Sequence, residues 1–209
     1  MEKDWLVYEK RLIAEGTGII AGIDEAGRGA LAGPVVAACI ILPTLWIPPD
    51  INDSKQLNAE QREKCFASII ENAVSLGIGV VSALEIDRIN ILRATHVAMQ
   101  QAYSQACSKS IPEITLIDGL PVKSFPAKQL SIVKGDSLSA TIAAASIVAK
   151  VTRDQIMRDL HITYPHYGFC NHKGYGTSDH IAALREHGAC EVHRKTFKPV
   201  SSLYDLVLL

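Results

Sequence analysis

Residues 23–29 read IDEAGRG, so two adjacent carboxylates, Asp24 and Glu25, stand between an apolar run and a glycine-rich turn. The run before them, residues 18–23, is short and contains flanking glycines, which is typical of a buried strand. Residues 33–42 form a second β-branched run of strand length. Acids at or near the end of a buried strand are costly unless a partner or a metal ion compensates them. This stretch therefore predicts a central strand pair with a functional site beside it.

The composition is that of an ordinary globular protein. The 209 residues are 48% hydrophobic and 21% charged, which suffices for one substantial core. The formal net charge is −1, so overall basicity does not indicate a polyanionic partner. Residues 150–198 carry eight lysines and arginines, five acids and six of the seven histidines. An argument for a charged partner must therefore rest on local charge.

Cysteines and apolar segments bound the class of protein. The five cysteines form an odd set without a CxxC pair, which favours reduced thiols over a disulfide framework or a zinc site. The charged amino terminus precedes no signal-type apolar core. Residues 29–49 are uncharged, but four prolines leave only 35–42 uninterrupted, far short of the ~20 residues of a spanning helix. We expect a monomeric, cytoplasmic protein that does not enter a membrane.

Hydrophobic periodicity predicts strands and helices within one core, and hence an α/β or α+β fold. Strands are expected at 18–23, 33–42, 75–83, 114–117 and 130–133, and helices at 5–14, 59–75, 85–107, 137–160, 178–186 and 201–208. Asn58 is the expected N-cap of the second helix. Small residues from 137 onward predict close packing of that helix on the sheet. Residues 164–177 are aromatic, glycine-rich and basic, and are expected to form an ordered loop.

Acids recur where predicted strands end. Asp24 and Glu25 follow the first strand, Asp118 ends the fourth, and Asp136 comes just after the fifth. Such acids converge if the strands are neighbours, and clustered carboxylates repel by something on the order of several kcal/mol unless cations lie between them. Hard oxygen ligands select Mg²⁺ or Mn²⁺. Two such ions can activate water and stabilise a leaving oxygen in phosphodiester hydrolysis.

Some of these positions also have simpler interpretations. Asp118 and its following glycine are compatible with a turn, and Asp136 with an N-cap for the helix at 137. Gly22 and Gly27 have P-loop spacing, but Arg28 and its neighbour replace the required Lys-Ser/Thr and two acids lie inside the loop. The glycines more plainly allow close approach to a ligand, with Arg28 available for a phosphate.

The longer motifs resemble type 2 ribonucleases H, specifically the bacterial ribonuclease HII family. The resemblance covers nearly the whole chain and rests on GIDEAGRGALAGPVV at 22–36, DSKQL at 53–57, the Asp118 strand end, KGDSLSATIAAASIVAK at 134–150, YPHYGFCNHKGYGT at 164–177 and HRKTFKPV at 193–200. It implies an RNase H-like α/β fold with a mixed five-stranded sheet flanked by helices. It also implies a catalytic core at 1–163 and a substrate-binding loop with helices at 164–209, packed as one compact unit.

The resemblance implies a metal-dependent endoribonuclease that cleaves the RNA strand of RNA–DNA hybrids. It also implies incision 5′ to single ribonucleotides embedded in duplex DNA, as in ribonucleotide excision repair, with 3′-hydroxyl and 5′-phosphate products. Two Mg²⁺ or Mn²⁺ ions are the implied cofactors. The implied catalytic and metal-binding acids are Asp24, Glu25, Asp118 and Asp136.

Substrate-binding positions follow from the same resemblance. Gly27, Arg28 and Gly29 are similar to a turn that senses the ribose 2′-hydroxyl. Tyr175 resembles a tyrosine that stacks on the sugar beyond the scissile phosphate, although a tyrosine between two glycines is also compatible with a plug at the core edge.

Four further positions resemble contacts to the nucleic-acid backbone: Ser54, Lys55, Arg194 and Lys195. Lys55 is equally compatible with a solvated loop charge. The histidines show no compact metal-ligand pair and are expected to be solvated or locally hydrogen-bonded, with His172 alone kept as a contributor to the site.

Three rival functions are weighed against this one. Ribonuclease HIII is similar in fold but usually carries a long N-terminal extension, and only a short segment precedes Asp24 here. A silent hybrid-binding protein is disfavoured because all four acids are present, and a P-loop module lacks its lysine. The apolar tail at 204–209 lacks the paired aromatics of a sliding-clamp peptide, so no clamp partner is expected.

Overall fold

A mixed five-stranded sheet forms the centre of the structure, a computed structural model that describes residues 3–52, 54 and 56–205. The strands are β1 (Ile20–Ala26), β2 (Val35–Ile41), β3 (Ser75–Val81), β4 (Ile114–Asp118) and β5 (Gln129–Ile132). Their order is β3-β2-β1-β4-β5. β1 pairs antiparallel with β2 and parallel with β4, and β5 extends the parallel side. This confirms the expected mixed sheet.

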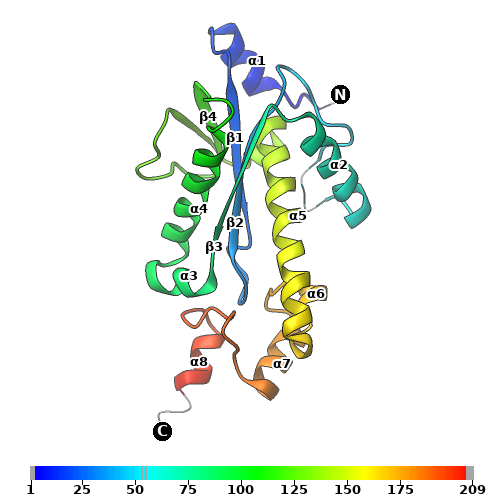
Figure 1. Cartoon of the computed structure of the whole chain (residues 1–209), viewed down its shortest axis with the longest axis vertical. Coiled ribbons are helices and arrows are strands. Elements are labelled where there is room, and N and C mark those ends of the chain that lie inside the picture. The colour runs from blue at the N-terminus through cyan, green and yellow to red at the C-terminus, as the bar shows by residue number, and fades with distance from the viewer. Residues whose placement is uncertain (1–2, 53, 55, 206–209) are drawn as a thin grey trace.

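Helices cover both faces of the sheet (Figure 1). They are α1 (Val7–Ala14), α2 (Ala59–Asn72), α3 (Ala83–Ile89), α4 (Ile91–Ala106), α5 (Ala140–Thr163), α6 (Phe169–His172), α7 (Ser178–His187) and α8 (Val200–Asp205), with 3₁₀ turns η1 (Gly135–Ser137) and η2 (Pro165–Tyr167). α4 packs on one face and α5, with α2 outside it, on the other. α6, α7 and α8 gather at one end of the molecule, beyond the strands (Figure 1).

The alternation of side chains along β2 explains why the sheet is buried on both faces. Ala37, Cys39 and Ile41 pack towards α4, whereas Ala38 and Ile40 pack towards the alanine-rich first half of α5. A strand that is buried on both sides reads as a continuous apolar run instead of an alternating one. The uncharged stretch in the sequence is therefore strand and loop. No helix in the described part of the chain has the length and apolarity to cross a membrane.

Glycines in the sheet let the helices approach closely. A Cβ added at Gly22 would lie 2.4 Å from the backbone carbon of Thr141 in α5. On the other face, a Cβ at Gly79 would lie 1.9 Å from the carbonyl oxygen of Ala98 in α4. Gly22 is also paired with Ile40 inside the sheet. The P-loop interpretation is therefore wrong, because the supposed phosphate loop is largely a β-strand.

Two helix predictions needed correction. The helix expected at 85–107 is two helices, because Asn90 adopts φ 67° between them and its side chain accepts a hydrogen bond from the Arg93 amide at 3.1 Å. The helix expected from 137 begins at Ala140 with Ser139 as N-cap. Asp136 lies in η1, so the interpretation of Asp136 as the N-cap of this helix is wrong.

Other local predictions stand. α2 begins behind Asn58, which forms a reciprocal capping box with Gln61. The loop expected at 164–177 is ordered and contains η2 and α6. The helix expected at 201–208 corresponds to α8, and residues 206–209 lie outside the described part.

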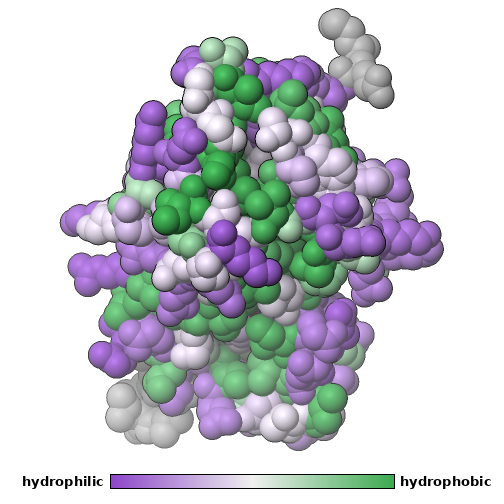
Figure 2. Space-filling view, turned by 45° about the horizontal axis from the view of Figure 1, so that its top comes forward, coloured by the Kyte–Doolittle hydropathy of each residue, from purple (hydrophilic) through white to green (hydrophobic). Residues whose placement is uncertain are grey.

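The surface mixes apolar and polar side chains. Figure 2 shows apolar side chains over the middle and upper part of one face, towards the end that carries α1, with hydrophilic side chains around them.

Candidate metal centre

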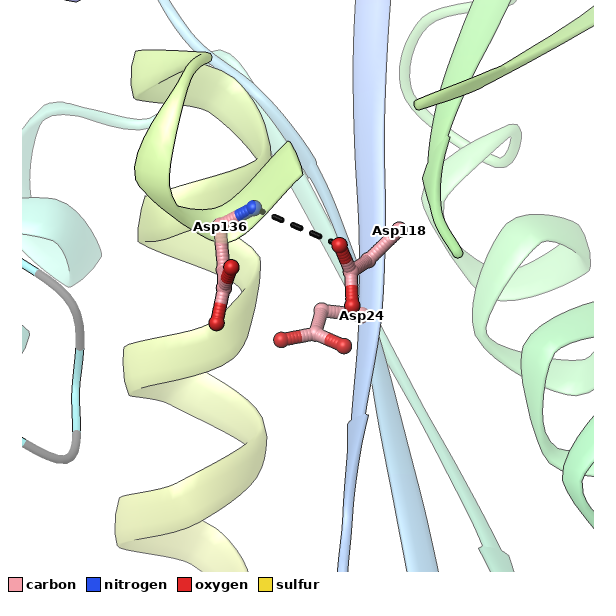
Figure 3. A group of neighbouring side chains, drawn as sticks. All are labelled: Asp24, Asp118 and Asp136. Atoms are coloured by element: carbon pink, nitrogen blue, oxygen red, sulfur yellow. Dashed lines mark hydrogen bonds between the residues drawn. The ribbon is translucent and has the colours of Figure 1, made fainter. Parts of the chain in front are cut away.

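Three acids from separate segments meet at one point. Asp24 lies within β1, Asp118 ends the neighbouring strand β4, and Asp136 lies in η1 just after β5. One carboxylate oxygen of each lies within 4.8 Å of the others. Figure 3 shows the three side chains pointing towards a common space. We call this group the acid cluster. Asp24 and Glu25 were expected just after the first strand, and the structure corrects this: both are part of β1.

Burial makes the acid cluster electrostatically costly. Asp24 is 5% exposed and Asp136 is 6% exposed. Burial, together with the charges of Glu25 and Asp118, raises the pKa of Asp24 well above its usual range, although hydrogen bonds from Ser146 and the Glu25 amide act in the opposite direction. A divalent cation among the carboxylates would reverse this balance. The donor set, three carboxylates with hard oxygen atoms, fits Mg²⁺ or Mn²⁺.

Backbone amides orient the cluster. The amide of Gly135 donates to Asp118 Oδ1 at 2.6 Å, and the amide of Asp136 approaches the same oxygen at 3.4 Å (Figure 3). The amide of Glu25 donates to Asp24 Oδ1 at 2.7 Å. The turn η1 thus ties the position of Asp136 to that of Asp118.

Glu25 does not join the other three acids. Its Oε1 accepts from Arg28 Nη1 at 3.2 Å. Burial raises the pKa of Glu25, while Arg28 acts to lower it. Successive strand residues point to opposite faces, which explains why Glu25 diverges from Asp24. Three of the four predicted acids are therefore brought together, and the fourth lies beside them in an ion pair.

A cavity of about 480 Å³, here called the metal cavity, opens beside these acids. Its lining contains eight of the residues predicted from sequence: Asp24, Glu25, Gly27, Arg28, Gly29, Ser54, Asp118 and Tyr175. Ser146 and Lys150 of α5 also line it, and sequence reasoning missed them. Their signal was present, since they are polar residues one helical turn apart in an alanine-rich helix.

Ser54 is buried and bonded within the protein. Its Oγ lies 3.0 Å from Ser146 Oγ, and Ser146 in turn hydrogen-bonds Asp24. Arg62 holds the same loop by donating to the carbonyl oxygens of Ser54 at 2.9 Å and Leu57 at 2.6 Å. This geometry places Ser54 where it orients Asp24 through Ser146. Lys55, its predicted companion, lies outside the described residues.

The turn at Gly27–Gly29, here called the glycine turn, is held from inside by Arg194. The guanidinium donates to the carbonyl oxygens of Gly27 at 2.7 Å, Arg28 at 2.8 Å and Gly33 at 3.0 Å. Arg194 is 0% exposed, and burial together with repulsion from Arg153 lowers its pKa to about 9. A guanidinium without exposed surface cannot contact the backbone of a bound nucleic acid. We therefore assign Arg194 to fixing the turn instead of the direct contact that its motif implied.

Arg153 holds the next part of the same segment. It is also 0% exposed and donates to the carbonyl oxygens of Ala32 at 3.0 Å, Pro34 at 2.9 Å and Lys173 at 2.9 Å. Gly27 has φ 92°, and a Cβ there would lie 1.9 Å from Arg153 Nε. Only glycine fits this position. Arg153 and Arg194, which we call the arginine pair, were both missed as structural groups.

Tyr175 faces the metal cavity. It is 37% exposed, and its ring centroid lies 5.4 Å from the Arg153 guanidinium carbon and 5.9 Å from Lys150 Nζ. The amide of Tyr175 donates to the His172 carbonyl oxygen at 2.9 Å. An exposed ring in a cavity does not fit the alternative of a core plug.

A histidine chain holds the Tyr175 backbone. His193 Nδ1 accepts from the Cys190 amide at 3.0 Å, so its proton lies on Nε2, which donates to His180 Nε2 at 3.0 Å. His180 Nδ1–H then donates to the Tyr175 carbonyl oxygen at 2.9 Å. Burial lowers the pKa of both histidines, that of His193 to about 4. Both rings are buried and hydrogen-bonded, as the local alternative predicted.

His172 and Lys195 lie apart from the acids. His172 Nδ1 accepts from the Gly174 amide at 3.2 Å, and its Nε2 bonds the Tyr167 carbonyl oxygen at 2.7 Å. Lys195 is exposed and its amide donates to Asp87 at 2.8 Å. It lines a separate cavity beside α3. A backbone contact by Lys195 stays a prediction.

Comparison with known proteins agrees with this arrangement. The Ribonuclease HII family model matches residues 21–200. Ribonuclease HII of Caldanaerobacter subterraneus is 55% identical over 190 residues, covering 91% of this chain and 78% of that protein. Ribonuclease HII of Acetivibrio thermocellus is 52% identical over 191 residues, 91% of this chain and 74% of that one.

Among solved structures, the ribonuclease H2 from Pyrococcus horikoshii matches with a TM-score of 0.76 and 26% identity. The match covers 90% of this chain and 98% of that chain. Its fold is that of the sheet and helices described above. The chain therefore belongs to the ribonuclease HII family of metal-dependent endoribonucleases.

Proposed function

We propose that the protein cleaves the RNA strand of RNA–DNA hybrids and incises 5′ to single ribonucleotides embedded in duplex DNA, leaving 3′-hydroxyl and 5′-phosphate ends. The observation that carries this proposal is the convergence of Asp24, Asp118 and Asp136 within 4.8 Å beside a cavity of about 480 Å³. The cavity also contains the glycine turn and Tyr175. A site for hydrolysis and a site for reading the sugar therefore share one space.

The acid cluster would hold two divalent cations, with Mg²⁺ or Mn²⁺ as the candidates. Bound there, the ions supply an acidified water and charge neutralisation at the leaving oxygen. Asp24 is the proposed central ligand, because it is buried and its carboxylate is fixed by Ser146 and the Glu25 amide. We propose that Glu25 completes the set after exchanging its ion pair with Arg28.

The glycine turn is suited to sensing a ribose 2′-hydroxyl. Arg194 draws the carbonyl groups of Gly27 and Arg28 inward, so the outer side of the turn lines the cavity. A Cβ at Gly29 would meet nothing within 4 Å, which leaves space for a sugar at this point. We propose that Tyr175 stacks on the sugar that follows the scissile phosphate, in agreement with its exposed ring.

We also propose a division of labour along the chain. Residues 1–163 supply the acids and residues 164–209 supply substrate contacts such as Tyr175. The two parts share a cluster of buried side chains that includes Leu31, Met157, Phe169 and Leu184. We further propose that the protein acts as a cytoplasmic monomer in ribonucleotide excision repair. Light scattering on the purified protein tests the monomer.

The deciding experiment is nicking of a duplex with one embedded ribonucleotide, scanned across Mg²⁺ and Mn²⁺ with a chelator control. Asp24→Asn should keep the fold and lose about a thousandfold or more in rate, because several kcal/mol of transition-state stabilisation depend on the ions. Glu71→Gln, an exposed acid on α2, is the matched control and should cut normally. Near-normal turnover by Asp24→Asn would overturn the assignment of the metal centre. Activity in the chelator would do the same.

A further inference from the structure

A second hollow of about 250 Å³ lies next to the metal cavity, between α2, α5 and the segment around α6. Its charged lining consists of four cations, Arg62, Lys150, Arg158 and Lys173, and two acids, Glu63 and Asp154. Lys150 lines both spaces, so the two adjoin. We call the second one the basic hollow.

The basic hollow carries a surplus of positive charge. Lys150 Nζ and Asp154 Oδ1 form an ion pair at 2.7 Å, and the two side chains are 23% and 11% exposed. This partly buried pair largely cancels itself. Arg62, Arg158 and Lys173 then face a single further acid, Glu63. The balance favours an anionic ligand.

Lys173 shows the cost of this arrangement. Burial lowers the pKa of its ammonium, and repulsion from Arg158 and Lys150 adds to the effect, although Asp154 opposes it. A half-buried cation among other cations is stabilised when an anion binds beside it. Arg62 contributes positive charge, but its guanidinium already donates to the carbonyl oxygens of Ser54 and Leu57. Arg158 donates through Nε and Nη2 to Gln155 Oε1, so its Nη1 group and the ammonium of Lys173 are the donors that suit a phosphate oxygen.

The direction of α5 links the basic hollow to the acids. Ser146, Lys150 and Arg158 fall on one face of α5 at intervals of four or eight residues, and each four-residue step advances by about 6 Å. Ser146 contacts Asp24, whereas Arg158 lies in the basic hollow. A strand that offers its scissile phosphate to the acid cluster carries a negative charge at every nucleotide. If the nucleic-acid strand follows α5, the phosphates next to the scissile one reach the basic hollow.

We propose that the basic hollow is a subsite for one backbone phosphate of the nucleic-acid substrate, a nucleotide or two from the scissile phosphate, held by Lys173 and Arg158. This inference rests on the proposed function and deepens it. The subsite would fix the register of the strand, so that the acids meet the correct phosphodiester.

The test is a binding scan with neutral phosphates. Asp24→Asn protein, which should not cut, is titrated with duplexes that contain one ribonucleotide and one methylphosphonate, placed at successive positions near the ribonucleotide. One position should weaken binding several-fold more than its neighbours. Adding Lys173→Gln and Arg158→Gln should abolish that position dependence, because the partner charge is gone. The slope of log affinity against log salt should fall by about 0.9, the value for one phosphate contact.

Two further variants serve as controls. Lys64→Gln removes an exposed cation from α2 that pairs with Glu60 outside the basic hollow, and it should leave both the scan and the salt slope unchanged. Lys173→Arg keeps the charge and should keep the position dependence, which separates loss of charge from loss of fold. A flat scan in the parent protein, or an unchanged scan in the double variant, would overturn the subsite.

The nicking assay separates this failure from failure of the proposed function. If the wild type nicks and Asp24→Asn does not, a failed scan removes only the subsite. If Asp24→Asn still nicks, the metal centre is wrong whatever the scan shows.

Discussion

The acid cluster and the arginine pair bury like charges in opposite ways. Each arginine donates to three carbonyl oxygens, so backbone dipoles compensate both cations. The acids face one another, and their hydrogen bonds do not offset burial, since the pKa of Asp24 is raised well above its usual range. Charge that the protein compensates itself serves structure. Buried charge that the protein leaves uncompensated is available for a ligand of opposite charge.

The largest change in stability should come from removing one member of the arginine pair, whose charges the backbone carbonyl groups compensate. Arg194→Met leaves three buried carbonyl groups without their donor and should reduce the free energy of unfolding by about 3–5 kcal/mol. Urea denaturation measures this. Arg185→Met, an exposed arginine on α7, is the matched control and should change stability little. Equal stability of the two variants would show that the arginine pair does not hold the turn.

The histidine chain offers a third case, in which buried groups stay neutral. Because burial lowers the folded-state pKa of His193 to about 4, its contribution to stability is complete above the unfolded value near 6.5 and is lost as pH falls towards 4. Thermal unfolding from pH 7.5 to 4 should show this loss, and His193→Asn should reduce the slope. His166→Gln, an exposed histidine, should not. If the wild type and His193→Asn lost stability with pH at the same rate, the proposed role of the histidine chain would be contradicted.

Removing a charge from the acid cluster should raise stability, whereas removing one from the arginine pair should lower it. In a chelator at pH 8, Asp24→Asn removes a costly buried charge and should raise stability by about 1–2 kcal/mol. Added Mg²⁺ should stabilise the wild type but not the variant, because ligand binding to the folded state raises stability. Melting with and without Mg²⁺ measures both effects. A destabilised variant without metal would mean that the protein compensates Asp24 itself.

The smallest predicted effect is that of changing Tyr175, whose ring lies in the metal cavity near Arg153. Tyr175→Ala should lower both the cleavage rate at a ribonucleotide–deoxyribonucleotide junction and the affinity for that duplex. The loss in rate should be about five times the loss in affinity, because the ring positions the sugar for attack. Tyr175→Phe should show the same bias in weaker form. Single-turnover rates and binding constants on one duplex separate the two quantities. Equal losses in both would indicate that Tyr175 is structural.

Patterns of hydrophobicity made the sheet and the acids predictable. Short apolar runs predicted β1, β2 and β4, and the acids near the ends of the predicted strands were expected to converge if those strands were neighbours, as β1 and β4 are. The break at Asn90 was not predictable from periodicity, because apolar spacing continues across it while the backbone adopts φ 67°.

The arginine pair was hidden for a different reason. Long basic side chains are usually exposed, and the carbonyl partners of Arg153 and Arg194 are brought together only by the three-dimensional course of residues 27–34 and, for Arg153, of the loop at Lys173. The histidine chain was hidden in the same way, since His180 and His193 meet only through the packing of α7 against the following loop. Local patterns reveal which elements form. They do not reveal which side chains the elements enclose.

The length of α5 has an evolutionary consequence. This one helix carries Ser146 against Asp24, then Arg153 against the segment of the glycine turn, and then Arg158 in the basic hollow. Inserting or deleting one residue between the first two would rotate everything beyond it by about 100°. The residues that cut and those that read the sugar would then face different directions. Natural length variation should therefore spare the middle of α5 and concentrate in the loops.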